Sequence, residues 1–155
     1  MNGNKELLLI QPATKYQTKG INMSRPLALA YIAALTPDHW NVRIIDELIE
    51  PVDFNARPDL IGISSYTASV NRAYELSTIY RNNNIPVVLG GLHVSMVPEE
   101  AEKYADSVVI GEAESVWGKL LLDFEAGKLQ KKVYRRTVAF RQPASSKKRT
   151  ITGKS

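Results

Sequence analysis

The chain has 155 residues, the usual size of one domain, of which 44% are apolar and 23% charged. It contains no cysteine, which excludes disulfides, thiolate zinc sites, cysteine nucleophiles and a self-contained iron–sulfur cluster. No run approaches the roughly 18 consecutive apolar residues of a membrane-spanning helix. The apolar run at residues 7–10 is too short for a signal peptide, so we expect a cytoplasmic protein without a membrane partner.

Charge divides the chain into two unlike parts. Residues 1–127 contain ten Lys or Arg and sixteen Asp or Glu, a net charge of −6, whereas residues 128–155 contain ten Lys or Arg and no acid, a net charge of +10. Residues 137–155 lack apolar periodicity and are rich in Ser, Thr and Lys, so burial cannot offset the entropy of ordering them. We predict a folded domain over residues 1–136 and a basic disordered tail or linker remnant over 137–155, whose binding to nucleic acid is limited to weak electrostatic attraction.

Strand and helix patterns alternate along the first part of the chain. Short β-branched apolar runs without alternation predict strands covered on both faces of a sheet, at residues 6–11, 42–46, 60–64, 86–89 and 107–110. Helical apolar spacing predicts helices at residues 26–35, 69–82, 98–104 and 114–125. Residues 47–58 contain two prolines and predict an extended connection. The order of elements predicts an α/β fold, a Rossmann-like or flavodoxin-like doubly wound sheet of five parallel strands.

In such a sheet, ligands bind beyond the carboxyl ends of the strands. The loop after the first strand reads Gln-Pro-Ala-Thr-Lys-Tyr, without the glycines of a dinucleotide-binding turn, and the chain has no phosphate-binding loop of the nucleoside-triphosphatase type. Hydroxyl and lysine side chains in that loop leave an FMN or nucleotide-type flavodoxin-like binder as an alternative: Thr14, Lys15, Thr18 and Lys19.

Two other loops carry a stronger signal. The third strand is followed by Ser64-Ser65-Tyr66-Thr67-Ala68-Ser69, and the fourth ends in Gly90-Gly91-Leu92-His93-Val94-Ser95. Clustered hydroxyls can bind the polar edge of a ligand, and paired glycines let a flat ligand approach the backbone. We therefore expect Gly91→Val to weaken ligand binding in a folded protein. The alternatives are that the serines cap a helix and that the glycines only form a turn.

Residues 5–136 resemble the cobalamin-binding domain found at the N-terminus of B12-dependent radical SAM proteins. The combination of G-G-x-H, P-E-E and V-x-G-E-A-E carries this resemblance, within the runs PLALAYIAAL (26–35), VRIIDE (42–47), DLIGISSYTASVNRAYEL (59–76), IPVVLGGLHVSMVPEEA (85–101) and ADSVVIGEAESVWGKLLLDFEAGKL (105–129). The resemblance implies cobalamin as the cofactor, with the corrin ring over the carboxyl ends of the strands and the nucleotide tail between strands. It implies a cofactor-binding set of Pro12, Ser64, Ser65, Tyr66, Thr67, Gly90, Gly91, Leu92, His93, Val94, Gly111, Glu112 and Glu114.

Some of these residues have plainer interpretations. His93 could instead hydrogen-bond at a helix end or be an ordinary polar loop residue, and Glu114 could simply begin a helix, where a carboxylate favours the dipole. We expect no catalytic residue and no metal ligand from the protein itself, so that cobalt comes only with the cofactor.

Two departures from related families bear on function. Methionine-synthase-like cobalamin domains carry D-x-H-x-x-G, whose histidine replaces the lower axial base, but the stretch after the second strand here reads Asp46-Glu47-Leu48-Ile49-Glu50. The resemblance therefore implies base-off cobalamin without a histidine ligand, the lower cobalt face being left to water or to a residue near the first two loops. A radical SAM domain needs C-x-x-x-C-x-x-C, so this chain is expected to be non-catalytic alone and to serve a radical SAM catalytic domain in trans or one that is lost. A protein-interaction domain that has lost its ligand is the remaining alternative.

Overall fold

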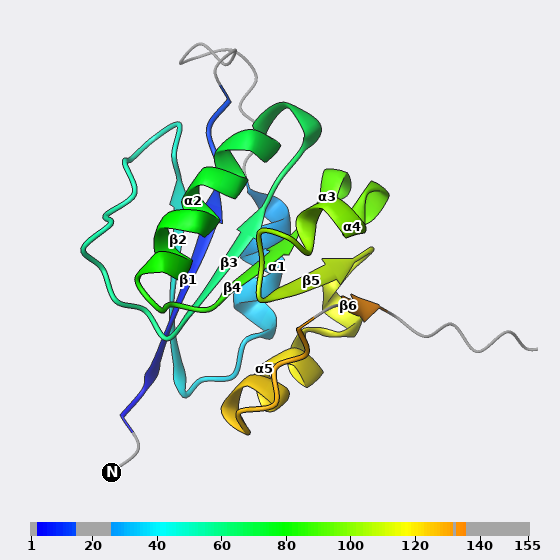
Figure 1. Ribbon diagram of the computed structural model, residues 1–155. Helices are drawn as coiled ribbons and strands as arrows, with labels where there is room; N and C mark the ends of the chain where they lie inside the picture. Colours follow the sequence, from blue (N-terminus) through cyan, green and yellow to red (C-terminus); the bar gives the residue numbers. More distant parts are fainter. Residues whose placement is uncertain (1–2, 15–25, 132, 136–155) are drawn as a thin grey trace, which may run out of the picture.

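A computed structural model describes residues 3–14, 26–131 and 133–135 (Figure 1). Six parallel strands form one sheet in the order β2-β1-β3-β4-β5-β6. The strands are β1 (Lys5–Gln11), β2 (Trp40–Asp46), β3 (Leu60–Ser64), β4 (Val87–Gly90), β5 (Ser107–Ile110) and β6 (Val133–Arg135). The predicted fold class is confirmed, and β6 adds a sixth strand to the five that were predicted. The predicted tail, residues 137–155, and the proposed boundary at residue 136 lie outside the described residues.

Helices cover both faces of this sheet (Figure 1). Within the described residues, five are α-helical: α1 (Leu27–Leu35), α2 (Val70–Asn82), α3 (Leu92–Met96), α4 (Pro98–Ala101) and α5 (Trp117–Glu125). Two short 3-10 turns, η1 (Thr67–Ser69) and η2 (Ala113–Ser115), precede α2 and α5. The buried side chains of α1 and α5 pack on one face of the sheet, and those of α2, α3 and α4 pack on the other.

Strand alternation divides the core into two layers. In β1, Leu7 and Leu9 point to the layer under α1 and α5, whereas Leu8 and Ile10 point to the layer under α2, as expected when successive side chains face opposite sides of a strand. All four are buried. The sheet is therefore covered on both faces along its central strands.

The connection between β2 and β3 contains no helix, and every residue of it, 47–59, is described. Val52 is buried in the layer under α2. The ring of Phe54 lies 5.9 Å from that of Tyr80, whose hydroxyl donates to the Asp53 carbonyl at 3.1 Å. An extended segment thus takes the place of a crossover helix, as the two prolines predicted.

Two predicted features differ from the structure. A helix was predicted over 98–104, but α4 ends at Ala101 and α3 lies before it. β2 is an edge strand, and its residues Asn41 and Arg43 are exposed, so the prediction of burial on both faces was wrong for this strand. In the described sheet β2 pairs with β1 on one side and has no strand on the other.

Candidate cofactor site

A cavity of about 390 Å³ lies on the α1 and α5 face of the sheet and extends to the loops after β3, β4 and β5. This volume falls within the range of about 300–1,000 Å³ that is usual for small-molecule sites. Most of the lining is apolar: Leu9, Ala28, Leu29, Ile32, Gly62, Ile63, Val88, Val109, Ala113 and Trp117. The remaining lining residues are Ser64, Gly90, Gly91, Leu92, Ser95, Gly111, Glu112 and Glu114, which lie at or beyond the carboxyl ends of the strands.

Two glycines of the central strands, Gly62 and Gly90, line this cavity. A Cβ on Gly62, in the middle of β3, would lie 2.8 Å from Leu9 Cδ2 and 3.8 Å from the Trp117 ring. A Cβ on Gly90 would lie 3.7 Å from Val109 Cβ, at ordinary contact distance. Side chains at either position would therefore project toward the cavity-lining layer. A glycine inside an otherwise apolar strand is a sequence signal for such close approach, and Gly62 could have been found by it.

Gly91 has a different role from the one expected. Its φ is +102°, and a Cβ there would lie 2.5 Å from the Ser65 carbonyl oxygen and 2.7 Å from the Ser65 nitrogen. The space beside Gly91 is filled by the chain itself, so a valine there would meet the Ser65 backbone first, and the expectation that it would fill ligand space in an otherwise unchanged fold does not agree with the structure. Gly91 is required by the fold before any ligand is considered.

The serines after β3 divide between local capping and the cavity. Ser69 Oγ accepts a hydrogen bond from the Tyr66 backbone N–H at 3.2 Å within the capping box of η1, but as the N-cap of α2 it makes no side-chain capping hydrogen bond. Ser64 lines the cavity. Ser65 is 1% exposed, and its Oγ has no hydrogen-bond partner within the described ranges. A buried hydroxyl in this condition is a candidate to bind a group that is not part of the chain.

His93 does not line the cavity and instead connects three helices. Its Nδ1 lies 3.1 Å from Thr67 Oγ1, and its Nε2 lies 3.5 Å from Glu100 Oε1. Tyr74 donates to the same Glu100 oxygen at 2.8 Å. That hydrogen bond is the largest cause of a lowered pKa for Glu100, while burial, followed by Glu100, raises the pKa of Tyr74. The contacts hold α3 against α4 and the beginning of α2.

Ser95 lines the cavity although it was not among the expected site residues. Its Oγ donates to the Gly91 carbonyl and accepts from the Gly111 N–H, both at 2.9 Å. One side chain thus joins the loop after β4 to the loop after β5, at the end of the cavity where Glu112 and Glu114 are exposed. Ser95 follows Gly91 by one helical turn, but the short α3 that places it was not predicted.

Of the expected site residues, seven line the cavity: Ser64, Gly90, Gly91, Leu92, Gly111, Glu112 and Glu114. Pro12 and Ser65 are buried at the ends of β1 and β3, and Tyr66 and Thr67 are exposed after β3. Val94 is 0% exposed, so its side chain is a core residue rather than a surface that a ligand could touch.

Residues 3–14, 26–131 and 133–135 offer neither a metal site of their own nor a membrane-spanning helix. Among them, no group of three or more His, Asp or Glu side chains could hold a metal ion. No helix in the same ranges is long and apolar enough to cross a membrane.

Comparison with known proteins identifies what this architecture is similar to. The B12 binding domain family matches residues 22–121. Bacteriochlorophyllide d C-8(2)-methyltransferase of Chlorobaculum tepidum is 37% identical over 107 residues, covering 68% of this chain and 24% of that protein. Bacteriochlorophyllide d C-12(1)-methyltransferase of the same organism is 34% identical over 136 residues, covering 84% of this chain and 29% of that protein. The chain therefore spans about a quarter of the length of these curated relatives.

A solved structure shares the fold. The cobalamin-dependent S-adenosylmethionine radical enzyme OxsB, with aqua-cobalamin bound, matches with a TM-score of 0.63 at 19% identity, covering 81% of this chain and 19% of that one. Together with the family match, it confirms the resemblance stated from the sequence.

Proposed function

Because the chain belongs to the B12-binding domain family, whose cofactor is cobalamin, we propose that the cavity on the α1 and α5 face receives the nucleotide tail of cobalamin. The corrin ring would then lie over the carboxyl ends of the strands. The observation that carries this proposal is the cavity itself, which is apolar, about 390 Å³ in volume and continuous with the loops after β3, β4 and β5.

The residues that line the cavity suit such a group. Gly90 leaves room on the sheet for a flat heterocycle, because a Cβ there would meet nothing closer than 3.7 Å, and the Trp117 ring lines the same cavity. The Ser64 hydroxyl at the end of β3 lines the cavity and can bind polar groups of the tail. Bound cobalamin would supply a cobalt centre able to carry a methyl group.

We propose that cobalamin binds in the base-off state without a histidine ligand. The chain has two histidines. His93 lies outside the cavity lining, with its Nδ1 bonded to Thr67 Oγ1 and its buried Nε2 3.5 Å from Glu100 Oε1 without a hydrogen bond among the described residues. The His39 carbonyl accepts from the Lys5 N–H at the start of β1, which is the opposite end of the sheet. Neither position favours coordination from below the ring.

The proposed role is that of a cofactor-binding module that acts with a catalytic partner. A radical SAM cluster needs three cysteines, and this chain has none. We therefore propose that a radical SAM domain, on a separate chain or on a longer one, performs the chemistry.

Absorbance titration with hydroxocobalamin and with diaquacobinamide, which lacks the nucleotide tail, tests this proposal. We expect saturable binding of cobalamin with the spectrum of the base-off form, and binding of cobinamide that is at least tenfold weaker. After reduction to cob(II)alamin, the electron paramagnetic resonance spectrum should lack splitting by an axial nitrogen. Equal affinities would contradict a tail-binding cavity, nitrogen splitting would contradict the base-off state, and binding of FMN in place of both corrinoids would favour the flavodoxin-like alternative.

A further inference from the structure

Glu47 hydrogen-bonds to the chain on both sides of Pro12. Its backbone N–H donates to the Gln11 carbonyl at 3.1 Å, and its carboxylate oxygen Oε2 accepts from the Ala13 N–H at 3.0 Å. Glu47 is the first residue after β2, whereas Gln11 is the last residue of β1. One residue therefore fixes the start of the loop that leaves the carboxyl end of β1.

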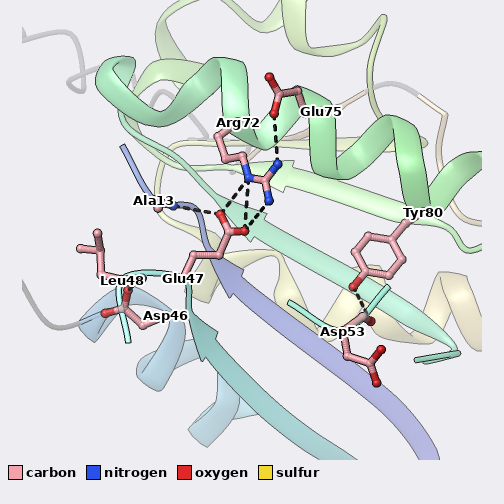
Figure 2. Close-up of polar contacts among 8 residues, drawn as sticks. All are labelled: Ala13, Asp46, Glu47, Leu48, Asp53, Arg72, Glu75 and Tyr80. Carbon is pink, nitrogen blue, oxygen red and sulfur yellow. Dashed lines mark hydrogen bonds and ion pairs between the residues drawn. The ribbon is translucent and has the colours of Figure 1, made fainter. Parts of the chain in front are cut away.

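Arg72 on α2 holds this carboxylate in place, as Figure 2 shows. Its Nη2 donates to Glu47 Oε1 at 2.8 Å, and its Nε lies 3.2 Å from both carboxylate oxygens. A third nitrogen, Nη1, reaches Glu75 Oε2 at 3.1 Å. The Glu47 side chain is only 6% exposed. Burial of a carboxylate is tolerated when a guanidinium and a backbone N–H both bind it.

The hydrogen bonds of Glu47 also decide whether its carboxylate could coordinate a metal ion. The resemblance left the lower cobalt face to water or to a residue near the first two loops, and Glu47 lies between those loops. Both of its carboxylate oxygens are already engaged by Arg72 and Ala13, so it is not free to coordinate a metal. Its geometry is that of a residue that holds a neighbouring segment.

That segment belongs to the strand that helps to form the cavity. Leu9 of β1 lines the cavity, and Pro12, three residues further, is buried where β1 ends. The orientation of Pro12 depends on Glu47 because both flanking residues bind it.

From these contacts we propose that Glu47 is a positioning residue for the corrin ring, and that it acts through the backbone at Pro12 and Ala13 and is itself held by Arg72. This inference rests on the proposed function and adds a residue directly after β2 that does not line the cavity.

A matched control exists at the same end of the sheet. Arg43 and Glu50 form an ion pair of 3.1 Å, and their side chains are 62% and 43% exposed. Glu50→Gln removes an acidic partner of arginine from the same connection without touching the loop after β1. It therefore separates loss of charge from loss of loop position.

The experiment measures corrinoid binding by Glu47→Gln, Arg72→Lys and Glu50→Gln in the full chain. A glutamine replaces one carboxylate oxygen by an NH2 group, which cannot accept a hydrogen bond, and it removes the negative charge that faces Arg72; a lysine cannot donate from several nitrogens. We expect Glu47→Gln and Arg72→Lys to bind both cobalamin and cobinamide about tenfold more weakly, because the ring is common to both. We also expect a changed paramagnetic resonance spectrum of bound cob(II)alamin, and Glu50→Gln should match the wild type. Urea unfolding shows which variants are folded, and Arg72→Lys carries the test if Glu47→Gln is not.

The outcomes separate this inference from the proposed function. Wild-type affinities and an unchanged spectrum in the folded variants would overturn the positioning role while leaving cobalamin binding intact. If Glu50→Gln weakened corrinoid binding as much as Glu47→Gln does, loss of surface charge would explain both results, and the positioning role of Glu47 would be overturned. Failure of the wild type to bind either corrinoid would overturn the proposed function first.

Discussion

Gly91 lies against the backbone of Ser65, so closely that a Cβ on Gly91 would come within 2.5 Å of the Ser65 carbonyl oxygen. The Ser65 N–H also donates to the Gly90 carbonyl at 3.0 Å. The chain segments that leave β3 and β4 are therefore in contact at the point where each strand ends. The shape of this end of the cavity depends on that contact.

We predict that Gly91→Ala destabilises the protein. A non-glycine residue at φ +102° is strained, and the added methyl group collides with backbone that cannot rotate away. The expected loss in the free energy of unfolding is about 2 kcal/mol or more, measured by urea denaturation. Gly118→Ala is the control, because that glycine is exposed on α5 and a Cβ there would have no atom within 4 Å. Alanine at this helical position should raise the free energy of unfolding by about 0.5–1 kcal/mol. Equal stability of the two variants would contradict this account of Gly91.

Filling the cavity from α1 should weaken binding of the nucleotide tail. Ala28 is exposed and lines the cavity, whereas Ala30 is exposed on the same helix and does not line it. We expect Ala28→Phe to lower the affinity for cobalamin at least tenfold, or about 1.4 kcal/mol, with little change for cobinamide. Ala30→Phe should bind both like the wild type. If Ala28→Phe bound cobalamin as tightly as Ala30→Phe does, the tail would have to lie elsewhere.

The Trp117 wall of the cavity is held by a buried hydrogen bond. Its indole N–H donates to Thr36 Oγ1 at 2.9 Å, and that hydroxyl donates to the Ile32 carbonyl at 2.8 Å. Thr36→Val leaves the indole N–H without this acceptor, so we predict a loss of about 1–3 kcal/mol in the free energy of unfolding. Thr78→Val is the comparison: Thr78 is exposed and donates to the Tyr74 carbonyl, and its replacement should change stability by less than about 0.5 kcal/mol. Similar losses for both would argue against a special role for the indole.

Acid should weaken the contact between the end of α5 and the start of β2. Glu125 Oε1 accepts hydrogen bonds from His39 Nε2 at 2.6 Å and from Trp40 Nε1 at 2.8 Å. The hydrogen bond with His39, and to a smaller extent the one with Trp40, lowers the pKa of Glu125 below its ordinary value of 4.5. The stabilisation is therefore present above pH 4.5 and lost as the pH falls through the lower pKa of the folded state. Glu125→Gln should be less stable than the wild type at pH 7, and the gap should narrow by pH 3 in urea unfolding. A gap that stays constant would mean that the charge of Glu125 contributes nothing.

The amino-acid pattern predicts the central sheet because its signals are local and strong. Buried β-branched runs and helical apolar spacing located five strands and most of the helices. The amino-acid pattern did not predict α3, a five-residue helix that starts directly after a glycine with positive φ, because so short a segment shows no apolar period. It also failed for β6, three residues in a basic stretch whose pairing with β5 is a tertiary contact.

The loop residues of the candidate site could be predicted from the sequence, whereas the helix residues that line its cavity could not. The carboxyl ends of the strands follow from the fold class, so Ser64 and the glycines after β4 could be expected there. Ala28 and Trp117 belong to helices far apart in the sequence, and only packing on the same face of the sheet brings both to one cavity. The use of Glu47 to hold Ala13 depends on side-chain geometry that no spacing rule describes.

The position of β6 has a consequence for solubility. It pairs in parallel with β5, and Tyr134, which is 3% exposed, is anchored through its hydroxyl to Asp123 of α5 and to the Gln130 N–H. Without these residues, the apolar Ser107–Ile110 strand would become an open edge, able to pair with the same strand of another molecule. A shortened chain ending before residue 133 should therefore self-associate, whereas one ending after Arg135 keeps that edge occupied and stays dispersed.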